Sequence, residues 1–220
     1  MDIEVIGVVA VALAASLCLL YYVSIWLPRQ FNRRILESLE AFSKAIELRF
    51  PSHRGTTELA MDRAAELGHR LGFGASRIAE LEMATRLRDI GLVAVPYRLV
   101  NHADMNEWTV EEQLVYDKHP EVGAAMIEQV PSLRHLGCVV RYHHVRWDRT
   151  RDREDIPMES RILKVVTDYG WLEREVGPDH AKAILTRLAG HDYHPDVVRH
   201  LLTMLNSESE SGFARAVVRA

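Results

Sequence analysis

Four side chains of types that commonly bind metal ions are Asp89, His119, His143 and His144. Asp89 closes a run of helical periodicity, His119 precedes Pro120, and the adjacent histidines close another apolar-periodic run. One carboxylate and three imidazoles suit a single borderline divalent ion such as iron, manganese, zinc or nickel. Neutral imidazoles need no counter-charge on burial, so such ligands can meet in a helical core at little desolvation cost. Spacing alone also fits unrelated surface and capping roles for the four residues.

The apolar pattern before the paired histidines indicates which way they face. Leu133, Leu136 and Val140 form one stripe of an expected helix. Adding three or four positions places His143 and His144 at the inner edge of this stripe. The alternative is that one histidine packs and the other is solvated.

Similar reasoning applies to His119 and to a fifth candidate, Asp168. Val115 precedes His119 by one helical turn, which predicts that His119 also points inward. Asp168 borders a stripe of apolar residues on its own expected helix, and the alternative is a solvated carboxylate beside a core stripe. The stripe contains Ile162, Val165, Val166 and Tyr169.

Four stretches of the sequence have a characteristic order and spacing. They are Ala84–Pro96 with the sequence ATRLRDIGLVAVP, Thr109–Glu112, His119–Gly123 and His143–Asp148. Together they resemble the HD-GYP family of metal-dependent HD-domain phosphodiesterases, which open cyclic di-GMP. The resemblance extends from about residue 56 to about residue 205. It implies that Asp89, His119, His143, His144 and Asp168 are metal ligands, with Asp89 also in a catalytic role.

The sequence departs from the HD-GYP pattern at positions around the expected site. Thr56 stands at the first histidine ligand, Arg88 at the histidine of the HD dipeptide, and Leu92 at the lysine that contacts phosphate. Trp171 replaces the second aspartate of the motif around Asp168, and a short charged loop replaces the Gly-Tyr-Pro signature. The lost ligands belong mainly to one metal of the family's bridged pair.

The matches to the other metal, Asp89 and the three histidines, are all present. A guanidinium at Arg88 is permanently charged and cannot bind a cation, but it can occupy the vacated half-site and pair with Asp168 or a phosphate. Arg88 and Arg146 are therefore candidate phosphate-binding residues. The sequence predicts one divalent transition metal per chain, with an arginine in place of the second ion.

Length and charge limit the classes of function. A chain of 220 residues accommodates one domain and an appendage. The net charge of −4 argues against nucleic acid as a partner, because neutralising phosphates requires a basic surface. The two cysteines, Cys18 and Cys138, lie in unrelated apolar runs and predict no disulfide framework.

The segment Ile3–Leu27 predicts a membrane anchor, because residues 5–27 contain no charge and a helix of about 25 residues exceeds the ~30 Å hydrocarbon core. A signal peptide is the alternative, but acidic residues precede the apolar run and the run is too long. The arginines at positions 29, 33 and 34 predict a single-pass protein of the inner membrane with its domain in the cytoplasm. We therefore expect an anchor over 1–28 that binds the membrane through residues 3–27.

Residues 29–50 predict a juxtamembrane helix. Ile35, Leu39, Phe42 and Ile46 repeat at spacings of four, three and four, as in a coiled coil that would make a homodimer. An amphipathic helix that lies on the membrane or against the domain explains the pattern equally well. The segment 51–55 marks the boundary of an HD-GYP-like domain over 51–205, and a Ser- and Glu-rich tail follows over 206–220.

The domain itself is expected to be all-α, an HD-domain-like helical bundle, because no stretch alternates like a strand for more than a few residues. Thr56 or Thr57 is expected to cap its first helix, and residues 93–106 are expected to form a loop. Further helices are expected over 110–118, 122–130, 133–143, 160–172, 181–188 and 197–205.

Function follows from the resemblance and from the departures. The chain is expected to be a membrane-anchored regulatory or binding module of cyclic-dinucleotide signalling, with one metal and little or no phosphodiesterase activity. Its expected partners are a cyclic dinucleotide or another phosphate ester, and a second copy or a signalling protein. The alternative is an active single-metal phosphohydrolase, and a third possibility is a scaffold in which the histidines have no metal.

Overall fold

The computed structural model describes residues 2–49, 55–101 and 107–218. The chain divides into two compact units, Met1–Lys44 and Ala45–Ala220. The folded unit thus begins several residues before position 51, where the sequence places the domain boundary. The last turn of the expected linker packs with the domain.

The first unit is helical. It comprises α1 (Ile3–Tyr21), the π-helix η1 (Tyr22–Trp26) and most of α2 (Leu27–Arg49). The rings of Tyr22 and Trp26 stack with centroids 4.9 Å apart. Among the described residues, the continuous helix from Ile3 to Arg49 is the one whose length and hydropathy suffice to cross a membrane.

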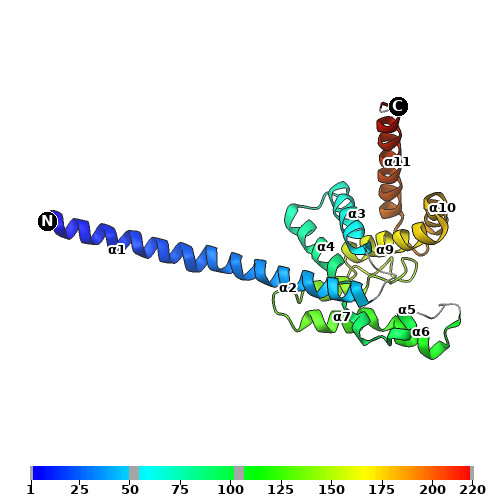
Figure 1. Cartoon of the computed structure of the whole chain (residues 1–220), viewed down its shortest axis with the longest axis horizontal. Coiled ribbons are helices and arrows are strands. Elements are labelled where there is room, and N and C mark those ends of the chain that lie inside the picture. The colour runs from blue at the N-terminus through cyan, green and yellow to red at the C-terminus, as the bar shows by residue number, and fades with distance from the viewer. Residues whose placement is uncertain (1, 50–54, 102–106, 219–220) are drawn as a thin grey trace. The chain divides into compact units, whose positions relative to one another are not determined.

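The second unit is a bundle of helices, shown in Figure 1. The described residues contain no strand, only an isolated bridge between Ala189 and Tyr193. The expectation of an all-α fold is confirmed. The helices are α3 (Thr56–Arg70), α4 (Ala75–Leu87), the 3-10 helix η3 (Ile90–Ala94), α5 (Tyr97–Asn101), α6 (Val110–Asp117), α7 (His119–Glu128), α8 (Leu136–Arg141), α9 (Met158–Val176), α10 (Pro178–Leu188) and α11 (Pro195–Val218).

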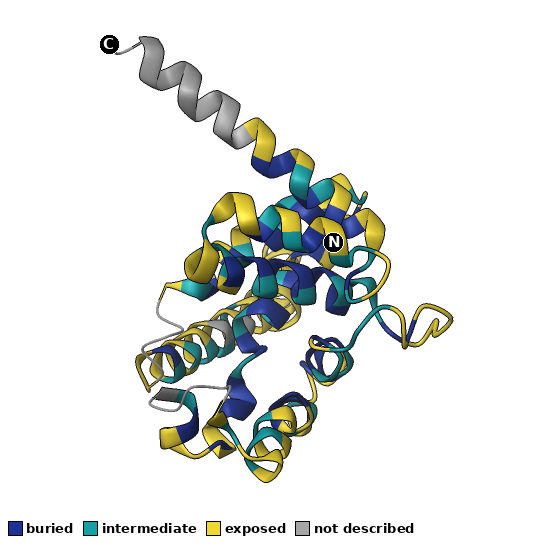
Figure 2. Cartoon of the chain, turned by 90° about the vertical axis from the view of Figure 1, so that its right-hand side faces the viewer, coloured by how far each residue is buried: buried dark blue, intermediate teal, exposed yellow. Residues whose placement is uncertain are grey.

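The core lies where α9 packs against α3 and α10, and where α3 packs against α4. Apolar residues at helical spacing form it, and Figure 2 shows the buried residues gathered on the inner faces of these helices. The stripe predicted for α9 is buried, and so are apolar residues at helical spacing in α3 and α4. Fully or almost fully buried members include Ala64, Leu67, Leu81, Ala84, Leu87, Ile162, Val165, Val166 and Tyr169.

The start of α3 differs from the expectation. Gly55 is the N-cap, with a φ of 70° that favours glycine, so the prediction of a threonine cap was wrong. A side chain from α2 provides the acceptor instead, because Glu47 Oε1 accepts a hydrogen bond of 3.2 Å from the backbone N–H of Thr57. Glu47 is buried, with 5% of its surface exposed. A carboxylate at a helix N-terminus is favoured by the orphan N–H groups and by the helix dipole.

Two other segments contain more helix than the sequence predicts. The expected loop over 93–106 contains the end of η3 and helix α5, while residues 102–106 lie outside the described part. Helix α11 continues to Val218, so the tail that was expected from Asn206 onwards is helical as far as that residue.

Gly91 makes the closest backbone approach in the folded unit. A Cβ atom at this position would lie 1.9 Å from the carbonyl oxygen of His119 and 2.6 Å from the backbone nitrogen of Gly123. Both contacts are to backbone atoms at the start of α7, which cannot rotate away as a side chain can. Glycine at position 91 therefore allows η3 to lie directly against the helix that begins with His119.

We predict that Gly91→Ala lowers the free energy of unfolding by about 3 kcal/mol or more, because overpacking against backbone costs at least as much as overpacking in a core. Gly170→Ala is the control, since its Cβ would meet only Arg63 Nη1 at 4.0 Å and alanine favours the interior of α9. Chemical denaturation of both variants measures the difference. Equal stability of the two variants would contradict the packing described.

Candidate metal centre

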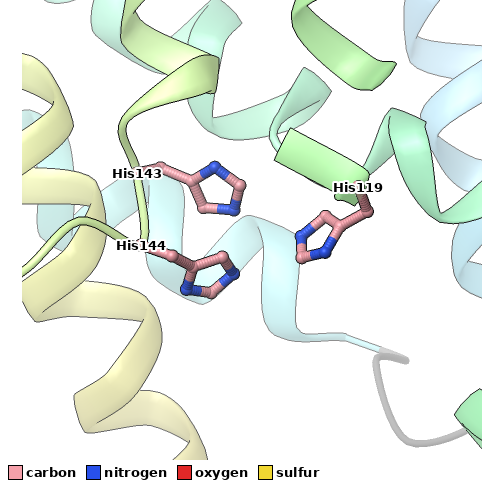
Figure 3. A group of neighbouring side chains, drawn as sticks. All are labelled: His119, His143 and His144. Atoms are coloured by element: carbon pink, nitrogen blue, oxygen red, sulfur yellow. The ribbon is translucent and has the colours of Figure 1, made fainter. Parts of the chain in front are cut away.

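Three histidines converge in the second unit. The possible ligand atoms of His119, His143 and His144 all lie within 4.8 Å of one another, and the described residues contain no other such group. His119 is the first residue of α7, and the other two lie in the turn that follows α8. Figure 3 shows the rings of His143 and His144 pointing across a gap towards the ring of His119.

The hydrogen bonds of two rings fix their tautomers. His119 Nδ1 lies 2.8 Å from the carbonyl oxygen of Tyr116, and His143 Nδ1 lies 2.6 Å from that of Val140. A carbonyl oxygen only accepts, so in each ring Nδ1 carries the hydrogen and Nε2 keeps its lone pair. This is the usual arrangement of a metal-binding histidine, whose other nitrogen donates to a carbonyl or carboxylate.

Burial keeps the rings of His143 and His144 neutral. His143 is completely buried, and its pKa is lowered to about 3 because burial and the nearby His119 both oppose a positive charge. His144 keeps exposed surface, yet enough protein and enough histidine surround its ring that its pKa also lies well below the ordinary value. A neutral imidazole is a metal ligand that need not lose a proton first.

Asp89 lies beside the histidines but outside the group that they form. Its charge raises the pKa values of His143 and His144 slightly, against the larger lowering effects. Its Oδ2 is 3.1 Å from Arg88 Nη2, in an ion pair whose side chains are 5% and 19% exposed for Arg88 and Asp89. The carboxylate thus faces both a buried cation and the neutral histidines.

The guanidinium of Arg88 is buried and hydrogen-bonded to the two segments around it. Nη1 donates to the carbonyl oxygen of Thr85 at 2.8 Å, and Nη2 donates to Thr56 Oγ1 at 3.3 Å. Thr56 and Arg88 are the residues that stand at the two missing histidine ligands. They lie in direct contact, which joins the start of α3 to the end of α4.

Asp168 is held away from Arg88 by other partners. Lys164 Nζ lies 2.9 Å from Asp168 Oδ2, one helical turn earlier on α9. Tyr193 also bonds to Asp168, and the pKa of Tyr193 is raised by burial and by the Asp168 charge. The structure therefore pairs Arg88 with Asp89, not with Asp168 as one interpretation of the sequence had it.

Arg146, the other candidate phosphate-binding residue, has carboxylate partners of its own. Its guanidinium lies 2.8 Å from Asp148 Oδ2 and 2.9 Å from Asp192 Oδ1. These pairs tie the turn after the histidines to the loop before α11, and a phosphate would have to compete with two carboxylates for this arginine.

The sequence did not point to Tyr116 or Lys164. Tyr116 lies against His119 with ring centroids 4.9 Å apart and accepts its Nδ1 hydrogen bond, which orients the ligand. Its own pKa is raised by burial and by the charges of Asp89 and Asp168. Lys164 had a usable signal, because a lysine four residues before an aspartate on one helix forms an ion pair.

The residues present fit a divalent metal ion. His143 Nε2 is buried and has no hydrogen-bond partner among the described residues, and such an orphaned acceptor normally has a ligand or a cost of about 1–3 kcal/mol. Two nitrogens at 2.0–2.1 Å from one ion lie at most about 4.2 Å apart. The histidine group, which lies within 4.8 Å, therefore needs only a small inward shift.

We predict that the metal-free protein loses stability as the pH falls from about 6.5 towards 3. The pKa of His143 is lowered from 6.5 to about 3, so in this window the unfolded chain binds a proton that the folded chain excludes. Denaturation after chelation at stepwise lower pH measures the slope. The slope should become shallower in His143→Phe, which keeps the volume but cannot titrate, and an unchanged slope would contradict the assignment.

The chain is similar in sequence to known HD-domain proteins. The protein-family model described as HD domain matches residues 40–197. A cyclic di-GMP phosphodiesterase of Vibrio cholerae is 30% identical over 138 residues, which are 54% of this chain and 27% of that protein. The cyclic di-GMP phosphodiesterase response regulator RpfG of Xanthomonas campestris is 26% identical over 143 residues, 62% of this chain and 37% of its own length. The chain thus spans about a quarter to a third of these relatives.

Solved structures agree on the fold. An HDG"Y"P protein from Bdellovibrio bacteriovorus superimposes with a TM-score of 0.57 at 16% identity over 69% of this chain and 51% of that one. The HD domain of the phosphodiesterase PgpH from L. monocytogenes, in complex with cyclic-di-AMP, gives 0.55 at 13% identity over 76% of this chain and 96% of that one. The resemblance read from the sequence is confirmed at the level of the family: this chain belongs to the HD domain family.

Proposed function

We propose that this chain is a membrane-anchored regulatory module of cyclic-dinucleotide signalling that holds one divalent metal ion and has little or no phosphodiesterase activity. The apolar segment over residues 3–27 anchors it in the cell inner membrane, with the domain in the cytoplasm. The likeness to cyclic di-GMP phosphodiesterases and to a cyclic-di-AMP-binding domain supports a cyclic dinucleotide as the ligand. The buried Arg88 is the observation on which the loss of activity rests.

The ion is held by ring nitrogens of His119, His143 and His144, with Asp89 as an oxygen ligand. A bound iron, manganese, zinc or nickel ion supplies Lewis acidity towards a phosphoryl oxygen or a water molecule. The hydrogen bonds of His119 to Tyr116 and of His143 to Val140 keep the two rings oriented. The exposed edge of His144 leaves the site open to a ligand from solvent.

Arg88 excludes a second ion from the neighbouring position. At an effective dielectric constant of about 20, a dication roughly 5 Å from a guanidinium meets a repulsion on the order of 7 kcal/mol. Arg88 is 4% exposed, so solvent screens it weakly. Its fixed charge partly replaces that of the missing ion, but it cannot activate a nucleophile, because a guanidinium has no lone pair to offer.

The missing groups account for weak or absent turnover. Hydrolysis of a phosphodiester at a two-metal site uses both ions to hold the attacking and leaving oxygens. Leu92, in place of a phosphate-contacting lysine, removes one more positive charge, and it is completely buried. Loss of each such group typically costs about 10²–10³ in rate.

Two observations favour the alternative, an active single-metal phosphohydrolase. His144 is exposed, so a phosphate ester can reach the ion. Arg88 forms an ion pair with Asp89, which places a positive charge beside the ion's oxygen ligand. Release of phosphate from a small phosphate ester, abolished in both Asp89→Asn and His143→Asn, would select this alternative over the regulatory module.

We predict that the double variant Thr56→His and Arg88→His gains a second metal ion and hydrolyses cyclic di-GMP at least about tenfold faster than the unchanged chain, since both missing ligands are restored where Thr56 and Arg88 touch. The double variant Thr56→Ala and Arg88→Ala is the control, because it removes the arginine without adding ligands. Chromatography of the linear dinucleotide and mononucleotide products measures the rate for each variant and for the unchanged chain. Hydrolysis by the unchanged chain as fast as by the histidine variant would overturn the proposal.

A further inference from the structure

The last turn of α2 packs on the segment that follows Asp89. Leu92, Val95 and Leu99 form a small buried cluster, and Ile46 packs against it. Tyr116 packs against the same cluster. Because Tyr116 also contacts the ring of His119 and accepts its Nδ1 hydrogen bond, the contacts run without a break from Ile46 to a metal ligand.

Glu47 connects the same helical turn to the other side of the site. Its carboxylate accepts from the N–H of Thr57, next to Thr56, whose hydroxyl accepts from Arg88. Glu47 is buried and Arg88 is buried. Removing the carboxylate would therefore loosen the start of α3 at the point where it meets the guanidinium that pairs with Asp89.

Arg49 provides a third contact to the same region. Its Nη1 donates to the carbonyl oxygen of Val93 at 3.2 Å, within η3. Gly91, two residues earlier in η3, lies directly against the backbone of His119. Ile46, Glu47 and Arg49, all in the last turn of α2, thus contact the segment after Asp89 or the start of α3.

We propose that the last turn of α2 positions the metal ligands, with Ile46 acting through Tyr116 on His119 and Glu47 acting through Thr56 and Arg88 on Asp89. The helix that carries the apolar N-terminal segment then ends as a structural part of the metal centre. Any rearrangement of this turn changes metal affinity. The proposal rests on the metal-binding function proposed above.

Exposure on α2 supports this assignment and supplies a control. Within this turn Ile46 is half-buried and Glu47 is buried, whereas Leu48 is 58% exposed. Leu48→Ala therefore shortens a side chain of similar size on the same turn without touching the contacts. Indirect positioning of this kind typically changes binding by roughly 2- to 30-fold.

The experiment uses the full chain in detergent or nanodiscs, with Co²⁺ as a probe whose absorption bands report the ligand geometry. We expect Ile46→Ala and Glu47→Ala to weaken Co²⁺ binding within that range and to shift the bands. Glu47→Gln should restore both, because the amide oxygen still accepts from Thr57. Leu48→Ala should match the unchanged chain.

Unchanged affinity and unchanged bands in Ile46→Ala and Glu47→Ala, with Co²⁺ bound to the unchanged chain, would overturn the positioning role while leaving the metal centre intact. No Co²⁺ bound to the unchanged chain would overturn both the metal function and this inference. If Ile46→Ala and Glu47→Ala fail to fold, Arg49→Ala decides, because it removes the exposed hydrogen bond to Val93 without cutting into the buried cluster. Unshifted bands in that variant count against the role.

Discussion

The buried charge of Arg88 is the constraint on which the site depends. A guanidinium with 4% exposure is tolerated only when its N–H groups and its charge have partners. The partners are the carbonyl oxygen of Thr85, the hydroxyl of Thr56 and the carboxylate of Asp89. They fix how the start of α3 meets the end of α4, and they assign Asp89 to two roles at once, as counter-ion to the arginine and as neighbour to the histidines.

His143, in contrast to Arg88, is buried without a charge. Burial lowers the pKa of His143 to about 3, so its ring is neutral at physiological pH and its Nε2 can only accept. One half of the centre thus holds a permanent positive charge and the other half holds neutral ligands. With a single dication among the histidines, the ion, Arg88 and Lys164 carry four positive charges beside the carboxylates of Asp89 and Asp168, and a second dication would raise that number to six.

Much of this could be predicted from the sequence, and the rest depended on contacts between distant segments. The apolar stripe of Ile162, Val165, Val166 and Tyr169 correctly predicted the inner face of α9, and the order of motifs pointed to the family and to the three histidines that the structure brings together. The inward position of His119 was argued from Val115, yet Val115 is 41% exposed and His119 instead opens α7, where Gly91 and Tyr116 hold it. Glu47 accepts a hydrogen bond from the N–H of Thr57, ten residues later in the sequence, and no local signal marks such a contact.

The metal content of the purified full chain tests the central claim most directly. Elemental analysis, made alongside the His143→Ala and Asp89→Ala variants, counts the ions per chain. The account predicts about one iron, manganese, zinc or nickel ion per chain, lost in the histidine variant and reduced in the aspartate variant. Two ions per chain would show that Arg88 does not exclude the second, and no ion after reconstitution would leave a helical scaffold whose buried histidines serve another purpose.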